Sequence, residues 1–146
     1  MASGSSRAAA LIDRYDAAWN AQDLDAISAM HDDAIVFHNH TADECVTGAA
    51  AVREHIGAIF ARWPTLRFER RSLRCGDDFA ASEWTAHAEH PDDGRQLEWD
   101  GVDIFPLTPE GRIARKDVYS SSATPRVSMS SSATSAAPRS TLSICA

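Results

Sequence analysis

The segment HDDAIVFHNH at residues 31–40 contains three histidines, and the last two, His38 and His40, are two positions apart. A neutral imidazole with an unperturbed pKa of about 6.5 can take up a proton near neutral pH. Side chains two apart on a strand point to the same face, so these two could also share a metal ion. The segment therefore allows three interpretations: a catalytic base with a companion, a pair of metal ligands, or the solvated end of an ordinary strand.

A metal site at this histidine pair would need further ligands. Candidate donors are Asp103, Asp117 and Cys45, but no spacing motif connects them to the histidines. The three cysteines of the chain are scattered and form no CxxC pair, which argues against a zinc ribbon or a disulfide framework. We therefore expect neither a metal nor another cofactor.

Two carboxylates share predicted strand faces with aromatic side chains. Asp103 alternates with Trp99 and Phe105, and Asp117 alternates with Tyr119, at the two-residue period of a strand. A half-buried carboxylate is costly unless it is protonated, paired or hydrogen-bonded, and its pKa rises when it faces an apolar cavity. Both residues are candidate acid/base groups, and the alternative for each is an ion pair with a nearby arginine.

Hydrophobic periodicity predicts the helices and strands that would position these residues. Apolar residues at steps of three and four predict helices at 8–20, at 24–30 after Asp23 as a cap, and between Gly48 and Pro64. Alternating patterns separated by short turns predict strands at 34–40, 66–75, 79–90, 95–107 and 112–120. The expected fold class is α+β, in which a curved sheet wraps a helical layer and leaves an open mouth.

Length, charge and composition limit the possible functions. A chain of 146 residues is long enough for one hydrophobic core, which we assign to residues 8–120, after a flexible N-terminus at 1–7. Residues 121–146 are rich in serine and lack acidic residues, and we expect a disordered tail there. A formal net charge of −7 without a basic stripe argues against nucleic acid or an anionic membrane as partner. With no apolar run long enough for a signal peptide or a membrane span, the expected location is the cytoplasm.

Three segments carry a resemblance to a known family. RYDAAWNAQDLDAISAMHDDAIVFHNH, TGAAAVREHI and WDGVDIFPLTPEGRIARKDVY are similar to the NTF2-like superfamily of the SnoaL type, which includes ketosteroid isomerase, limonene epoxide hydrolase and small polyketide cyclases. The resemblance covers about residues 8–120 and implies a cone of three N-terminal helices packed on a curved, mostly antiparallel sheet. In this superfamily the outer sheet face commonly forms a dimer. We expect a homodimer through that face, particularly if Trp84 lies on it.

The resemblance to ketosteroid isomerase implies roles for three residues. Tyr15 and Asp103 stand where that enzyme keeps its oxyanion donors, one of them a protonated aspartic acid, and His38 replaces its aspartate base. Together these residues imply a small cofactor-independent enzyme, an isomerase or cyclase, that abstracts a proton next to a carbonyl. The implied substrate is a hydrophobic ketone or a polyketide-like compound. Asp117 would act as a second acid/base group.

Two other functions stay open. Asp117 matches the water-activating carboxylate of limonene epoxide hydrolase, but the arginine and second aspartate of that enzyme fall on Trp84 and Ala86, so epoxide hydrolysis is the weaker alternative. The other alternative is a non-catalytic module for ligand binding or dimerisation. The residues expected to contact a substrate are His40, Trp19, Phe60, Trp99, Phe105 and Tyr119.

Overall fold

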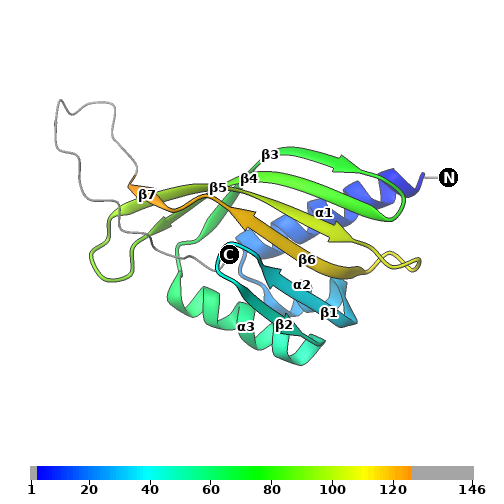
Figure 1. The fold of residues 1–146 in the computed structure, drawn as a ribbon, viewed down its shortest axis with the longest axis horizontal. Coiled ribbons are helices and arrows are strands. Elements are labelled where there is room, and N and C mark those ends of the chain that lie inside the picture. Colours follow the sequence, from blue (N-terminus) through cyan, green and yellow to red (C-terminus); the bar gives the residue numbers. More distant parts are fainter. Residues whose placement is uncertain (1–2, 126–146) are drawn as a thin grey trace.

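The computed structural model describes residues 3–125, in which helices pack on one curved sheet (Figure 1). The helices are α1 (Gly4–Asn20), α2 (Leu24–Met30) and α3 (Ala49–Arg62). The strands are β1 (His31–Asn39), β2 (Glu44–Thr47), β3 (Arg67–Cys75), β4 (Phe79–Glu89), β5 (Gln96–Pro106), β6 (Ile113–Ser120) and β7 (Thr124–Pro125). The expected α+β class, with three helices on a curved sheet, is confirmed.

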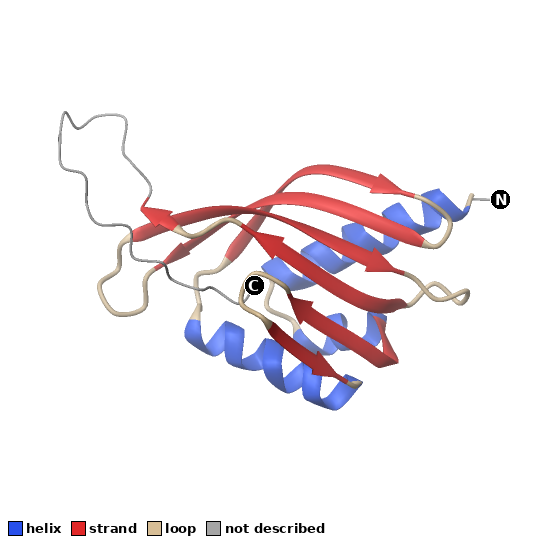
Figure 2. Cartoon of the chain, in the orientation of Figure 1, coloured by secondary structure: helices blue, strands red, loops and turns tan. Residues whose placement is uncertain are grey.

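The order of the strands follows from the short turns of the sequence. The main path through the sheet is β2-β1-β6-β5-β4-β3, and β7 pairs with β5. Strands β3 to β6 form the antiparallel meander that the turns predict, whereas β1 runs parallel to β6 and makes the sheet mixed. Helix α1 lies against β3 and β4, and α3 lies against β1 and β2 (Figure 2).

Local interactions explain where the helices begin. The Ser3 side chain accepts a hydrogen bond from the backbone N–H of Ser6, so α1 begins at Gly4, inside the segment expected to be flexible. Asp23 caps α2 as predicted, because its carboxylate accepts from the Ala26 N–H at 3.1 Å. No helix within the described residues has the length and apolarity needed to cross a membrane.

Two short strands differ from the sequence-based expectation. Strand β2 was not predicted, because its four residues lie in a polar loop and are too few to show a period. Strand β7 lies in the stretch assigned to the tail and pairs with β5 through Thr124 and Pro125. The rest of the predicted tail, residues 126–146, lies outside the described part of the chain.

Strand alternation determines which face each side chain joins. On β1, Ile35 and Phe37 are fully buried against the helices, so the alternate residues His38 and His40 project from the outer face of the sheet. Strand β6 is in parallel register with β1, and Phe37 is opposite Lys116. Lys116 is therefore buried on the inner face.

Candidate active site

A cavity of about 340 Å³ lies between α1 and the inner face of strands β3 to β6. Its walls are aromatic: Tyr15 and Trp19 come from α1, Phe68 from β3 and Trp84 from β4. Aromatic walls with a few polar groups are typical of pockets that bind small organic molecules.

The polar side chains of the cavity range from solvent-exposed at one end to buried at the other. Side-chain exposure is 60% at Asp13 and 33% at Asp16, and both carboxylates contact Arg70, at 2.8 and 3.1 Å. Exposure falls to 11% at Asp103 and 3% at Lys116. Asp13, Asp16 and Arg70 therefore lie at the mouth of the cavity. The Asp103–Lys116 pair lies at its floor.

The floor holds a carboxylate and an ammonium in loose contact. Lys116 Nζ is 3.8 Å from Asp103 Oδ2 and 3.6 Å from the centroid of the Trp19 ring. Asp103 Oδ1 is buried and has no hydrogen-bond partner among the described residues. Buried polar atoms usually have a partner, so this oxygen is available to a bound molecule.

Burial shifts the protonation of both floor residues. It raises the pKa of Asp103 to about 6, although the attraction of Lys116 opposes the shift. It also lowers the pKa of Lys116, against the attraction of Asp103. The raised pKa of Asp103 has the expected direction.

Tyr15 lines the cavity but its hydroxyl already has a partner. The hydroxyl oxygen is 2.7 Å from Nε2 of His31, and both side chains are buried. Burial is the main cause that lowers the pKa of His31 to about 4, with Lys116 and Arg112 adding to the effect, so the imidazole is neutral at pH 7. Tyr15 could serve as an oxyanion donor only by exchanging this hydrogen bond.

The structure corrects the expected position of His38. His38, His40, Asp117 and Tyr119 do not line the cavity and lie on the outer face of the sheet. The physical reason is the two-residue period of β1: Phe37 occupies the core, so its neighbours point away from it. The structure therefore does not bring His38 together with Asp103.

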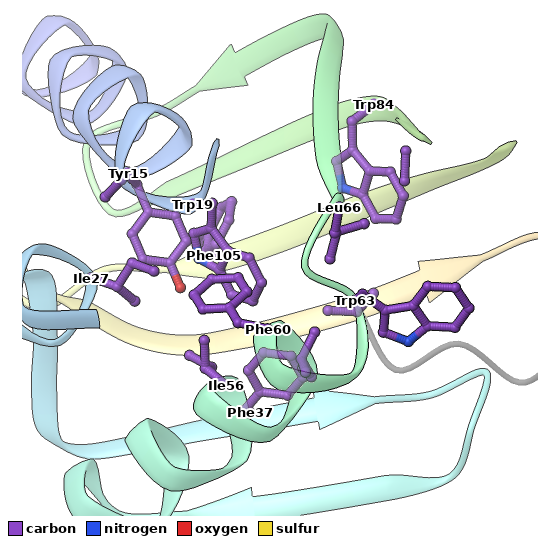
Figure 3. Close-up of a cluster of buried hydrophobic side chains, with 14 of the residues drawn as sticks. Tyr15, Trp19, Ile27, Phe37, Ile56, Phe60, Trp63, Leu66, Trp84 and Phe105 are labelled. Carbon is purple, nitrogen blue, oxygen red and sulfur yellow. The ribbon is translucent and has the colours of Figure 1, made fainter. Parts of the chain in front are cut away.

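The remaining predicted contact residues divide between cavity and core. Trp19 lines the cavity, with its ring centroid 5.2 Å from that of Phe60. Phe60 and Phe105 belong to the buried hydrophobic cluster behind it (Figure 3). Trp99 is part of the same cluster. The condition that Trp84 lies on the outer face is not met: Trp84 is buried on the inner face and lines the cavity, so it cannot seat a second subunit on the outer face.

Sequence reasoning missed Lys116, Asp16 and Arg70. Lys116 lies in the charged run ARKD, which is typical of an exposed segment, and only the register with β1 shows that it is buried. Asp13 and Asp16 are three positions apart on a helix and so share one side of it, a spacing that could have indicated the mouth.

The wall of the cavity at Trp84 depends on the absence of a side chain at Gly101. A Cβ atom at this position would overlap the six-membered ring of Trp84. We predict that Gly101→Ala lowers the free energy of unfolding by about 1–3 kcal/mol, because the ring must move within a packed wall. Urea denaturation measures the change. Gly57→Ala on α3 is the control, since its Cβ would make an ordinary contact with Leu24; an equal effect of both substitutions would contradict the prediction.

A family profile described as a SnoaL-like domain matches residues 12–116. The chain belongs to the SnoaL-like family. Two solved structures show the same fold as this SnoaL-like domain. SalBIII, an epoxide hydrolase/cyclase-like enzyme in pyran ring formation in the polyether salinomycin, is 24% identical with a TM-score of 0.70, over 78% of this chain and 90% of SalBIII. A SnoaL-like polyketide cyclase from Jannaschia sp. CCS1 is 15% identical with a TM-score of 0.74, over 82% of this chain and 89% of the cyclase. A comparison with curated proteins gives no match.

Proposed function

We propose that this SnoaL-like domain is an enzyme that transfers a proton next to the carbonyl group of a hydrophobic small molecule. The observation that carries the proposal is the Asp103–Lys116 pair at the floor of an aromatic-walled cavity. In this assignment Asp103 is the base, in place of His38, and Lys116 stabilises the oxygen on which negative charge develops.

Asp103 has the properties of a general base. It is mainly ionised at pH 7, and a base with a pKa near the working pH combines the reactive form with useful basicity. Its Oδ1 atom makes no hydrogen bond of standard geometry within the described residues, although the nearby Trp84 side chain helps to hold the pKa of Asp103 down. An exposed carboxylate with an ordinary pKa near 4 would be a much weaker base.

Lys116 supplies a positive charge where an enolate oxygen would form. The ammonium is 3% exposed and packs on the Trp19 ring, so water screens its charge little. A fixed donor in such a dry site stabilises a developing oxyanion more strongly than it would in water. Tyr15 would be a second donor after release from His31.

The proposed reaction begins when the C–H bond next to the carbonyl breaks. Its proton moves to Asp103, and its electron pair forms an enolate whose oxygen faces Lys116. If the ketone carries a neighbouring C=C bond, the enolate is conjugated with it, and return of the proton from Asp103 to the far carbon of that bond gives an isomer. Alternatively, the enolate carbon attacks a second carbonyl within the same molecule and closes a ring, and the alkoxide formed from that carbonyl takes the proton back from Asp103. The aromatic walls favour conjugated or polycyclic ketones, which matches the polyketide-like substrate implied by the sequence.

The pH dependence of proton exchange tests this function. We expect the full-length protein to exchange α-protons of a panel of polycyclic ketones with D₂O, followed by NMR. The rate should rise with pH through about 6, as Asp103 loses its proton, and fall again at higher pH when Lys116 becomes neutral. Binding of these ketones, detected by tryptophan fluorescence, without any exchange would instead assign the cavity to a non-catalytic binding module.

A further inference from the structure

Three side chains of metal-ligand type gather on the outer face of the sheet, away from the cavity. His38 projects from β1, His40 follows directly after this strand, and Asp117 projects from β6, where it is opposite His38 in the parallel register. One nitrogen or oxygen atom of each residue lies within 4.8 Å of those of the other two. The proposed proton-transfer chemistry uses none of them.

Neighbouring groups restrict the orientation of these side chains. The His40 ring stacks on both His38, at 3.6 Å between centroids, and Tyr119, at 4.2 Å. Its Nε2 atom is 2.8 Å from Asp117 Oδ1. The side chains of His40 and Asp117 keep 28% and 14% exposure, so an ion from solution can reach partly oriented ligands.

Arg115 is the competitor for the same carboxylate. Its Nε donates to Asp117 Oδ2 at 3.0 Å, and its Nη2 donates to Oδ1 at 2.7 Å. A metal ion must share or replace the second of these hydrogen bonds. The spacing of the ligand atoms must also adjust, since Zn–N bonds of about 2.0–2.1 Å place tetrahedral ligands about 3.3 Å apart, whereas His40 Nε2 and Asp117 Oδ1 are 2.8 Å apart and the three ligand atoms lie within 4.8 Å of one another.

We propose that His38, His40 and Asp117 bind a divalent transition metal ion such as Zn²⁺, with a coordination position left for water. Two imidazole nitrogens and one carboxylate oxygen suit Zn²⁺, Ni²⁺ and Cu²⁺, whereas Mg²⁺ and Ca²⁺ prefer oxygen ligands. This inference departs from the sequence-based expectation of no metal, because the sequence did not show that β6 brings Asp117 beside the histidine pair. It is independent of the proposed function, which uses the opposite face.

Calorimetric titration of the EDTA-treated full-length chain with Zn²⁺ tests the site. We expect one ion per chain, with affinity reduced at least tenfold in His38→Ala and in His40→Ala, since even the partners of metal ligands contribute about 10- to 100-fold. Arg115→Gln should bind Zn²⁺ more tightly than the unmodified protein, because the competing guanidinium is gone. Titration with Mg²⁺ should give no heat that depends on these residues.

His87→Ala is the matched control. His87 lies on β4 of the same sheet and also contacts carboxylates, Glu69 at 3.3 Å and Glu98 at 3.8 Å, so it tests whether any histidine near acidic groups suffices. Its removal should leave Zn²⁺ affinity unchanged. Circular dichroism confirms that each variant is folded. The proposal is overturned if neither the unmodified protein nor Arg115→Gln binds Zn²⁺, or if binding is the same in the His38 and His40 variants.

Discussion

Replacing Asp103 by asparagine is expected to reduce α-proton exchange by about 10²- to 10⁴-fold, the usual contribution of a positioned general base. Asparagine has nearly the same shape as aspartate but cannot accept the proton. Exchange followed by NMR at pH 7 gives kcat/KM for both proteins. Asp100→Asn is the control, because Asp100 lies on the same strand but is exposed on the outer face.

The Asp103→Asn variant also leaves the buried ammonium of Lys116 without its counter-charge. Removing one partner of a buried ion pair destabilises a protein by about 3–5 kcal/mol, so the variant could lose activity by unfolding. The double variant Asp103→Asn/Lys116→Met removes both charges and should fold stably while it stays inactive. Activity in a folded double variant would refute the assignment of Asp103 as base.

Acid stability should depend strongly on His31. Its pKa is about 4 in the folded protein and 6.5 in an unfolded chain, so the unfolded state takes up the proton first as pH falls below 6.5. The loss of stability grows until pH 4, and a difference of 2.5 pKa units corresponds to about 3 kcal/mol. We predict that His31→Gln, which keeps a hydrogen-bond partner for Tyr15, removes most of this loss.

The effect of His31 on stability is obtained by comparing two proteins at the same pH, because Asp103 also changes its protonation in this pH range. The pKa of Asp103 is raised on folding, so this group stabilises the folded state as pH falls from about 6 and opposes the effect of His31. Urea denaturation of His31→Gln and of the unmodified protein at pH 7 and pH 4.5 isolates the histidine. An equal loss of stability in both proteins between these pH values would show that His31 is not the cause. His87→Gln controls for the removal of a histidine elsewhere.

Much of the fold could be predicted because the signals are local. The Asp23 cap, the stop at Pro64 and the short turns between the last strands lie in the sequence itself, and the structure has these elements in place. The face of the sheet from which the Asp103 side chain projects was also predictable, since Asp103 alternates along its strand with large apolar residues that must face the core. These features depend on neighbours along the chain.

The errors arose where a residue depends on a distant partner. Both faces of β1 carry apolar side chains or side chains with a ring, so the pattern does not show which face is buried. Pairing with β6 determines that the face with Ile35 and Phe37 is the buried one. Lys116 could not be recognised as buried for the same reason. The sequence left open which face Trp84 joins; in the structure the glycine opposite it, Gly101, leaves room for its ring on the inner face.

Lys116 and Asp117 are consecutive residues of β6, so one peptide bond joins the floor of the cavity to the histidine cluster on the far side of the sheet. Deleting a single residue of β6 before Lys116 would turn the following side chains to the opposite faces of the sheet. The Asp117 carboxylate would then enter the cavity beside Asp103, and the Lys116 ammonium would lie beside the histidine side chains. Two carboxylates would then repel each other inside the cavity, and a lysine ammonium would replace the carboxylate beside the histidines on the outer face. The register of β6 with its neighbouring strands therefore determines both the side chains at the floor of the cavity and those of the histidine cluster. A shift of this register would change both surfaces together.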